Sequence, residues 1–246
     1  FKGEVVLEGT HTGINQPLLS FINAEFRQPV TVKMQGGTIR FGVTQLYTRS
    51  VVFQSSLLLD KPGTTVEFGD GFTPSRMSAA GTISVASGQM TSGELRFYKY
   101  RSLTATPQLI QLNGSGTDST YATRILTTDS TDFAGEVYLR ADRVQLDGGR
   151  FAAQTTVEQL GASSATRAMG GIINSVTTLN AGGNRFLDSL IVINRRSGVW
   201  EWESSRQDTH GKGIRISHAA LGTGWTSWAN TGVVTLPHLT VSSSAN

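Results

Sequence analysis

The sequence contains no cysteine among its 246 residues. Disulfide bonds, thiolate metal ligands and cysteine nucleophiles are therefore excluded, and any stability outside the cell has to come from packing or assembly. Charge is also sparse, since 16% of the residues are charged and the formal net charge is +3. No dense run of lysine and arginine occurs, and we expect no nucleic-acid partner because such a partner would need one.

Long apolar runs and targeting signals are missing as well. No stretch approaches the roughly 18 apolar residues of a membrane span, so we expect no membrane insertion. No signal peptide precedes the first residues, FKGEVVLEG, which already read as a strand, and we expect the chain to be a segment of a longer protein. With 28 glycines and only six prolines, the composition is typical of a folded, β-rich protein.

Alternating and β-branched runs fill most of the chain and predict an all-β fold. Such runs are GEVVLEG, VTVKMQGGTIRFG, VVFQSSLLL, TTVEFGDG, TISVASG, GELRFYKY, QLIQLNG, GEVYLRADRVQLDGG, SLIVINRR, GVWEWES and GIRISHA. Helical periodicity is almost absent. The best helical candidate covers residues 155–176, and its glycines limit it to a short, poor helix.

Glycine-containing pairs at 36–37, 148–149, 70–71 and 197–198 read as hairpin turns or corners. Turn signals arrive about every 8 to 12 residues through the first 150 residues, which fits elongated β-sandwich, β-prism or β-solenoid-like modules. No strict solenoid period is visible. We divide the chain into β-rich modules over 1–160, a connector over 161–185, and a β-hairpin module over 186–246.

An internal echo suggests a repeated building block. FKGEVVLEG at 1–9 and FAGEVYLRA at 133–141 share the pattern F-x-G-E-V-x-L. Each is followed further on by a strand, a Gly-Gly pair and another strand. The alternative is chance similarity between β-rich sequences.

The chemistry-bearing residues give no clear catalytic or metal signature. No G-x-S-x-G motif occurs, and the four histidines are scattered, with His11 and His238 far from the others. A hairpin between His210 and His218, together with Asp208, makes a metal site conceivable, but no further clear ligand completes it. We therefore expect neither a metal nor a cofactor.

The segment WEWE is the strongest acidic candidate. On a strand, Glu201 and Glu203 share one face at a separation of about 7 Å, a distance that suits carboxylate chemistry, while Trp200 and Trp202 share the other face. The simpler interpretation, which we favour, turns the indoles toward a core or an interface and the glutamates toward water. Asp129 and Asp132 read as turn residues.

The run GTGWTSWANTG, with Trp225 and Trp228, resembles the terminal repeats of bacteriophage tail fibres, and SLIVINRRSGVWEWESSRQDTHGKGIRISH resembles their hairpin-rich modules. The resemblance covers residues 186–246, whereas the first 150 residues resemble no fibre module. It implies an intertwined homotrimer in the virion that contacts other tail proteins and binds a host-surface glycan or outer-membrane receptor. We expect the two tryptophans to be packed at subunit contacts, so that replacing either with alanine impairs assembly; the alternative is a sugar site.

Two other functions stay open. DSTDFAGEVYLRADRVQLDGGRF resembles the passenger repeats of bacterial autotransporters, which implies a monomeric β-solenoid adhesin at the bacterial surface. A polysaccharide depolymerase, as among tailspike relatives, would use Glu201 and Glu203, or Glu67 and Asp70, as its acids. The tail-fibre interpretation implies structure and adhesion without enzymatic activity.

Overall fold

The computed structural model describes residues 1–11, 17–42, 51–60, 63–69, 75–77, 81–85, 93–112, 124–160, 167–168, 183–194, 199–201, 208–218, 226–227 and 238–243. In this part of the chain the fold is all-β, as the sequence predicts, and each pair of neighbouring strands is parallel. The strands form sheets of nine, eight, six and three strands. None of the described residues belongs to a helix long and apolar enough to cross a membrane.

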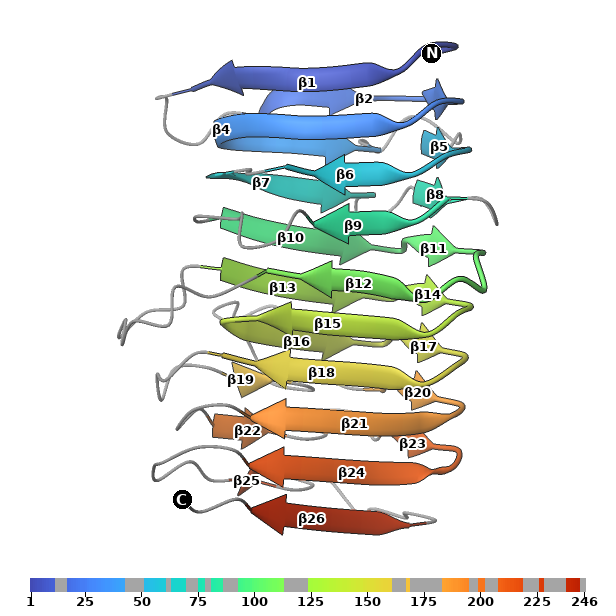
Figure 1. The fold of residues 1–246 in the computed structure, drawn as a ribbon, viewed down its shortest axis with the longest axis vertical. Helices are drawn as coiled ribbons and strands as arrows, with labels where there is room; N and C mark the ends of the chain where they lie inside the picture. Colours follow the sequence, from blue (N-terminus) through green and yellow to red (C-terminus); the bar gives the residue numbers. More distant parts are fainter. Residues whose placement is uncertain are drawn as a thin grey trace.

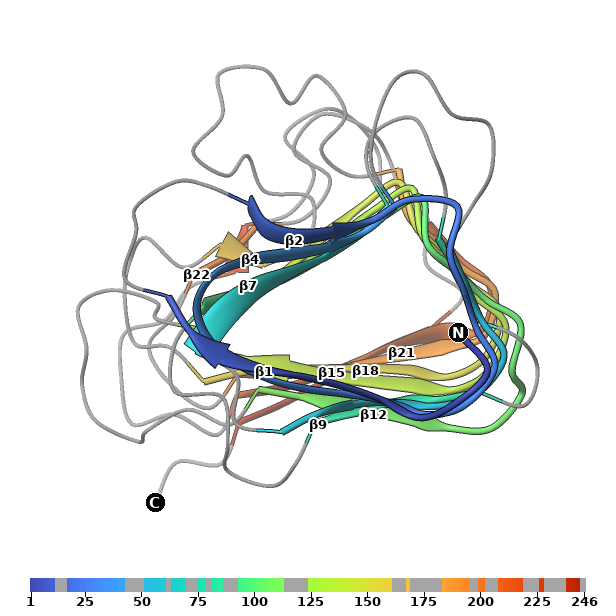
Figure 2. The ribbon, with the colours of Figure 1, turned by 90° about the horizontal axis from the view of Figure 1, so that it is seen from above.

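The sheets form the three faces of an elongated stack of strands, which is seen from the side in Figure 1 and from one end in Figure 2. The first face contains β2 (Pro17–Phe21), the second half of β4 (Val30–Phe41), β7 (Gly63–Phe68), β10 (Gly93–Tyr98), β13 (Arg124–Asp129), β16 (Arg143–Asp147), β19 (Arg167–Ala168), β22 (Val199–Glu201) and β25 (Thr226–Ser227). The second face contains β3 (Glu25–Phe26), β5 (Val51–Phe53), β8 (Ser75–Met77), β11 (Arg101–Ser102), β14 (Asp132–Phe133), β17 (Arg150–Phe151), β20 (Arg185–Phe186) and β23 (Thr209–His210).

The third face contains β1 (Val5–Thr10), the first half of β4, β6 (Leu57–Leu59), β9 (Ile83–Val85), β12 (Gln108–Gln111), β15 (Val137–Ala141), β18 (Thr155–Gln159), β21 (Ser189–Asn194), β24 (Gly213–His218) and β26 (Leu239–Ser243). The chain visits the third, first and second faces in turn and then repeats the circuit. Each circuit adds its strands beside those of the previous one, so neighbouring strands in space are usually separated by a whole circuit in sequence.

A column of aromatic rings runs inside the second face. Phe26 stacks on Phe53 with ring centroids 5.2 Å apart, and Phe133, Phe151 and Phe186 continue the column with centroids 5.7 and 5.0 Å apart. These five rings are at most 1% exposed. Offset-stacked and edge-to-face packing of buried rings adds stability beyond the burial of apolar area, so this column ties successive circuits together.

A second column lines the first face, where Phe41 stacks on Phe68 and Phe68 on Phe97 with centroids 5.5 and 4.8 Å apart. The two columns meet edge to face inside the stack. Where Ser102 takes the ring position of the second-face column, the fully buried ring of Tyr100 contacts both Phe97 and Phe133. The larger side chain thereby fills the space that the serine leaves.

The corner between the first and second faces has a fixed backbone conformation. Asn23, Lys99 and Ser130 have φ near +50°, and Gly148 takes the same place with φ of 55°. A left-handed residue turns the chain sharply, and asparagine and glycine tolerate it best. The predicted turn between Asp129 and Asp132 is confirmed, because Ser130 forms this corner.

One local prediction is wrong. Residues 155–159, assigned to the start of a helix, form β18, since the β-branched run Thr155–Val157 favours a strand when its alternate side chains are buried. The glycine pairs, predicted to form hairpin turns or corners, form corners where they are described. Gly36 and Gly37 lie inside β4 with φ near +71°, where they bend one strand from the third face to the first.

The F-x-G-E-V-x-L echo corresponds to equivalent places in the fold. Phe1 stacks on Phe26 as Phe133 stacks on Phe151, and Val5 and Val137 each begin a strand of the third face. The later Gly-Gly pairs are not equivalent, because one bends β4 and the other forms a corner. The repeat therefore covers one corner and one strand.

Strand pairing continues across the predicted connector. β18, which ends at residue 159, pairs in register with β21, which begins at residue 189, and β17 pairs with β20. The described strand pairs between residues 186 and 246 are parallel. The division of the chain at residues 160 and 186 stays a prediction.

Candidate functional site

Two short strands from the tryptophan-rich segments pair on the first face. Trp200 and Glu201 belong to β22, which pairs with β25 so that Trp200 lies opposite Thr226 and Glu201 opposite Ser227. Trp202, Glu203, Trp225 and Trp228 lie outside the described residues, and their roles stay predictions.

Glu67, the other acidic candidate, is held by two arginines. Its carboxylate forms ion pairs with Arg40 and with Arg96, the latter at 2.8 Å, and only 6% of the residue is exposed. The two guanidinium groups engage one carboxylate oxygen each, so both oxygens are occupied. The arrangement suits a structural ion pair on the first face better than a proton donor. Its proposed partner, Asp70, lies outside the described residues.

The residues considered for a metal site are distributed over two faces. His210 lies in β23 on the second face and His218 in β24 on the third, so the predicted hairpin between them does not form. The His210 ring stacks on Phe186 at 5.4 Å, and burial lowers its pKa to about 4. Asp208 accepts hydrogen bonds from the backbone and side chain of Asn184. The described residues contain no group of three potential metal ligands.

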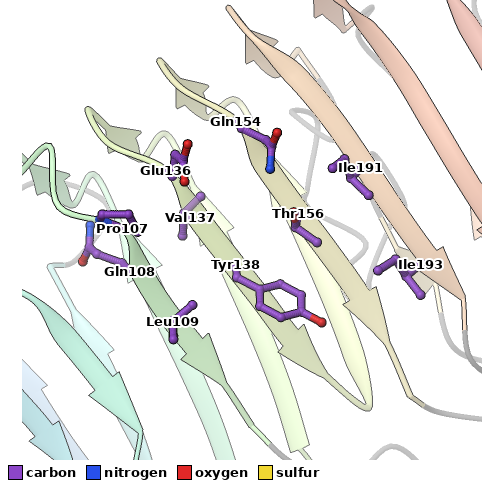
Figure 3. Close-up of a pocket in the computed structure, with 10 residues that line it drawn as sticks. All are labelled: Pro107, Gln108, Leu109, Glu136, Val137, Tyr138, Gln154, Thr156, Ile191 and Ile193. Carbon is purple, nitrogen blue, oxygen red and sulfur yellow. The ribbon is translucent and has the colours of Figure 1, made fainter.

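A hollow of about 340 Å³ lies on the outside of the third face (Figure 3). Its floor is formed by outward-facing side chains from neighbouring strands, namely Leu109 of β12, Tyr138 of β15, Thr156 of β18 and Ile191 of β21. These residues occupy successive register positions, so the parallel stack aligns them in one row. Leu109 is 56% exposed, so its apolar side chain is available at the surface of the hollow.

A second hollow, of about 320 Å³, continues the first along the stack. The two share Gln154 and Ile191, and the second adds the polar side chains of Lys212, Arg215 and His238. Lys212 is paired with Asp188 at 2.6 Å. Together the hollows form what we call the third-face groove, a depression that crosses the strands from β12 to β26, with an apolar floor at one end and a polar lining at the other.

A buried carboxylate supports the floor of the groove. Glu158 of β18 is 2% exposed, accepts a hydrogen bond from the Tyr138 hydroxyl, and lies 3.3 Å from the guanidinium of Arg140. These contacts hold the Tyr138 ring in one orientation on the outside of the sheet. A fixed ring beside aliphatic side chains provides a flat surface that can bind an extended ligand.

The groove carries one carboxylate of its own, Glu136, among the described residues that line it. None of these residues was selected from the sequence, because the groove is assembled from strands far apart in the chain. The only local signal is the outward position of Leu109, Tyr138 and Ile191 in alternating runs.

Comparison with known protein families, with curated proteins and with solved structures finds no match to this chain.

Proposed function

We propose that this chain is a β-solenoid segment of a phage tail fibre or tailspike that assembles as a homotrimer and attaches the virion to a glycan on the host surface. The third-face groove carries this proposal. It is exposed, extends across several circuits, and combines aliphatic side chains and a fixed tyrosine ring with hydrogen-bonding groups. Such a surface suits a linear sugar polymer that lies along the stack.

The binding part of the proposal is tested with Leu109→Gln. This substitution places a polar amide on the apolar floor, where Leu109 is 56% exposed, and we expect weaker binding to glycans extracted from the host envelope, measured by biolayer interferometry. Leu58→Gln is the matched control because Leu58 is also an outward, 36% exposed leucine of the third face, in β6 and outside the groove. Equal binding by both variants and the unmodified chain would contradict a groove site.

The assembly part is tested by the mass of the native protein in solution. One chain has a mass of 26.4 kDa, and a fibre or tailspike segment should give three times that value by light scattering. Trp225→Ala and Trp228→Ala should then reduce the trimeric fraction. If both variants assemble normally and lose host binding, the tryptophans contact a ligand instead.

A monomeric adhesin of the autotransporter-passenger type is the second candidate function. The parallel, circuit-by-circuit pairing of the strands is the arrangement that this alternative predicts. A native mass near that of one chain would favour it over the fibre.

A further inference from the structure

The second face aligns arginines that are far apart in the sequence. Arg101, Asp132, Arg150 and Arg185 occupy successive register positions in β11, β14, β17 and β20, and Arg76 of β8 takes the adjoining position. Neighbouring strands are about 4.8 Å apart, so Arg101 and Arg185 are separated by roughly 14 Å at the backbone. We call Arg101, Asp132, Arg150 and Arg185 the arginine column.

The guanidinium groups of this column face outward. In β11, β17 and β20 the arginine is exposed and the next residue is buried, as expected for a strand with one face in the core. Arg150 pairs with Asp132 at 2.9 Å. Among the described residues no ion pair engages Arg101 or Arg185, so within this part of the chain two arginines without an ion-pair partner flank a neutral pair.

The alignment of arginines on neighbouring strands does not by itself stabilise the folded chain. Like charges at directly opposite positions of neighbouring strands repel each other, and Arg150 lies opposite Arg185. A bound anion would remove this repulsion, because a guanidinium group binds a carboxylate through two parallel hydrogen bonds.

An apolar column runs beside the arginines. Leu103, Ala134, Ala152 and Leu187 follow the buried residues of the same strands, and backbone hydrogen bonds keep them in line, for example from Leu187 to Phe151 at 2.9 Å. Leu103 and Leu187 are 55% and 40% exposed. A ligand with apolar ring faces and regularly placed anionic groups fits these two parallel columns.

We infer that the second face binds a linear acidic polysaccharide, with carboxylates on Arg101 and Arg185 and sugar rings against Leu103 and Leu187. This inference rests on the proposed attachment function and names the class of glycan. Nucleic acid fits less well, because the aromatic rings of this face, such as Phe133 and Phe151, are fully buried and offer the bases no surface for stacking. The single-file column also presents few charges to a phosphate backbone.

The test uses the full chain and three polymers: polygalacturonate, its fully methyl-esterified form, and a single-stranded polynucleotide. The ester keeps the sugar backbone and removes the charge. We expect polygalacturonate to bind at least about tenfold more tightly than the ester. Its affinity should fall as the salt concentration is raised. In the double variant Arg101→Gln, Arg185→Gln, we expect polygalacturonate affinity to fall by about tenfold or more.

The control is Lys33→Gln, Arg143→Gln, which lowers the net charge by the same amount on the third and first faces, away from the second face. Circular dichroism and native mass verify that each variant is folded. Unchanged polygalacturonate affinity in the arginine-column variant, an equal loss in the control variant, or equal binding of the ester would each overturn the inference. Tighter binding of the polynucleotide would identify a nucleic-acid surface instead.

The failure of this inference can be distinguished from the failure of the attachment function. If host glycan binding depends on Leu109 and not on the arginines, attachment stands and the arginine column is not its site. If the column binds polygalacturonate but the chain does not bind host envelopes, the inference stands and the attachment function is wrong.

Discussion

Gly135 lies in the tight turn between β14 and β15, against the turn of the preceding circuit. A Cβ atom at this position would lie 2.7 Å from the carbonyl oxygen of Thr104 and 2.8 Å from the carbonyl carbon of Ala105. Both are backbone atoms that cannot move aside. We therefore expect Gly135→Ala to lower the free energy of unfolding by about 1–3 kcal/mol, measured by urea denaturation.

Gly3 provides the matched control, since it occupies the equivalent place in the F-x-G-E-V-x-L pattern and its Cβ position has no atom within 4 Å. Gly3→Ala should change stability by no more than about 0.5 kcal/mol. Similar losses in the two variants would rule out the contact with the preceding turn as the cause.

His210 makes the stability of the chain depend on pH. Its pKa is lowered from 6.5 to about 4 by burial, so between these values the unfolded chain binds a proton that the folded chain does not. Stability should therefore fall as the pH falls from 6.5 to 4, by an amount of order 3 kcal/mol. The loss is complete below pH 4, where both states are protonated.

His210→Phe should remove this contribution and extend the ring column beyond Phe186. We expect the thermal midpoint of the variant to exceed that of the unmodified chain by more at pH 4.5 than at pH 7. Parallel pH profiles for the two proteins would show that His210 is not the group responsible.

At the scale of the elements, the aromatic columns are the main connection between circuits. Phe133 is fully buried between Phe97, Tyr100 and Phe151. Phe133→Ala should therefore cost about 3–5 kcal/mol of stability. Phe1 stacks at the end of the same column but is 57% exposed, and Phe1→Ala should cost clearly less by the same urea measurement. Equal losses of stability in the two variants would mean that the contribution of a ring does not depend on its position in the column.

The strands themselves could be predicted because their alternation is local. In Val137–Ala141, for example, residues 137, 139 and 141 are buried and the two between them are less so, as the sequence pattern indicates. The corner at Ser130 could also be predicted from the sequence, since residues that favour turns surround it.

The stacking could not be predicted in the same way. The rings that stack in the second-face column include Phe133, Phe151 and Phe186, so the chain length between successive members nearly doubles from one circuit to the next. Loops of variable length hide the period, and no fixed spacing links Phe151 to its neighbours in space. For the same reason the third-face groove and the arginine column have no counterpart in any short segment of sequence.

At the scale of the whole molecule, the two candidate binding surfaces lie on different faces. The third-face groove and the arginine column each run along the stack, across successive circuits. A side-by-side assembly that covers one face can therefore leave the other exposed. Substitutions such as Leu109→Gln and Arg101→Gln should act independently, because the two side chains are exposed on different faces.

The parallel pairing also predicts how the molecule opens. In the described part of the chain the strands pair with strands of adjacent circuits, so stability is a sum of neighbour-to-neighbour terms, and β1 and β26 each pair with one described strand. Hydrogen exchange of backbone amides should be slowest in β15 and β18, around Leu139 and Val157, and fastest in β1 and β26. The expected order follows distance from the ends, since opening an inner strand disrupts two interfaces.

Mass spectrometry of peptides covering these four strands measures the order directly. Exchange should be measured with and without a low concentration of urea, because urea most strongly lowers the protection of amides that exchange through global unfolding. If β1, β15, β18 and β26 exchange at one common rate, the stack opens as a single cooperative unit. The ring columns would then couple all circuits more strongly than contact between neighbours implies, and Phe133→Ala should accelerate exchange in all four strands equally.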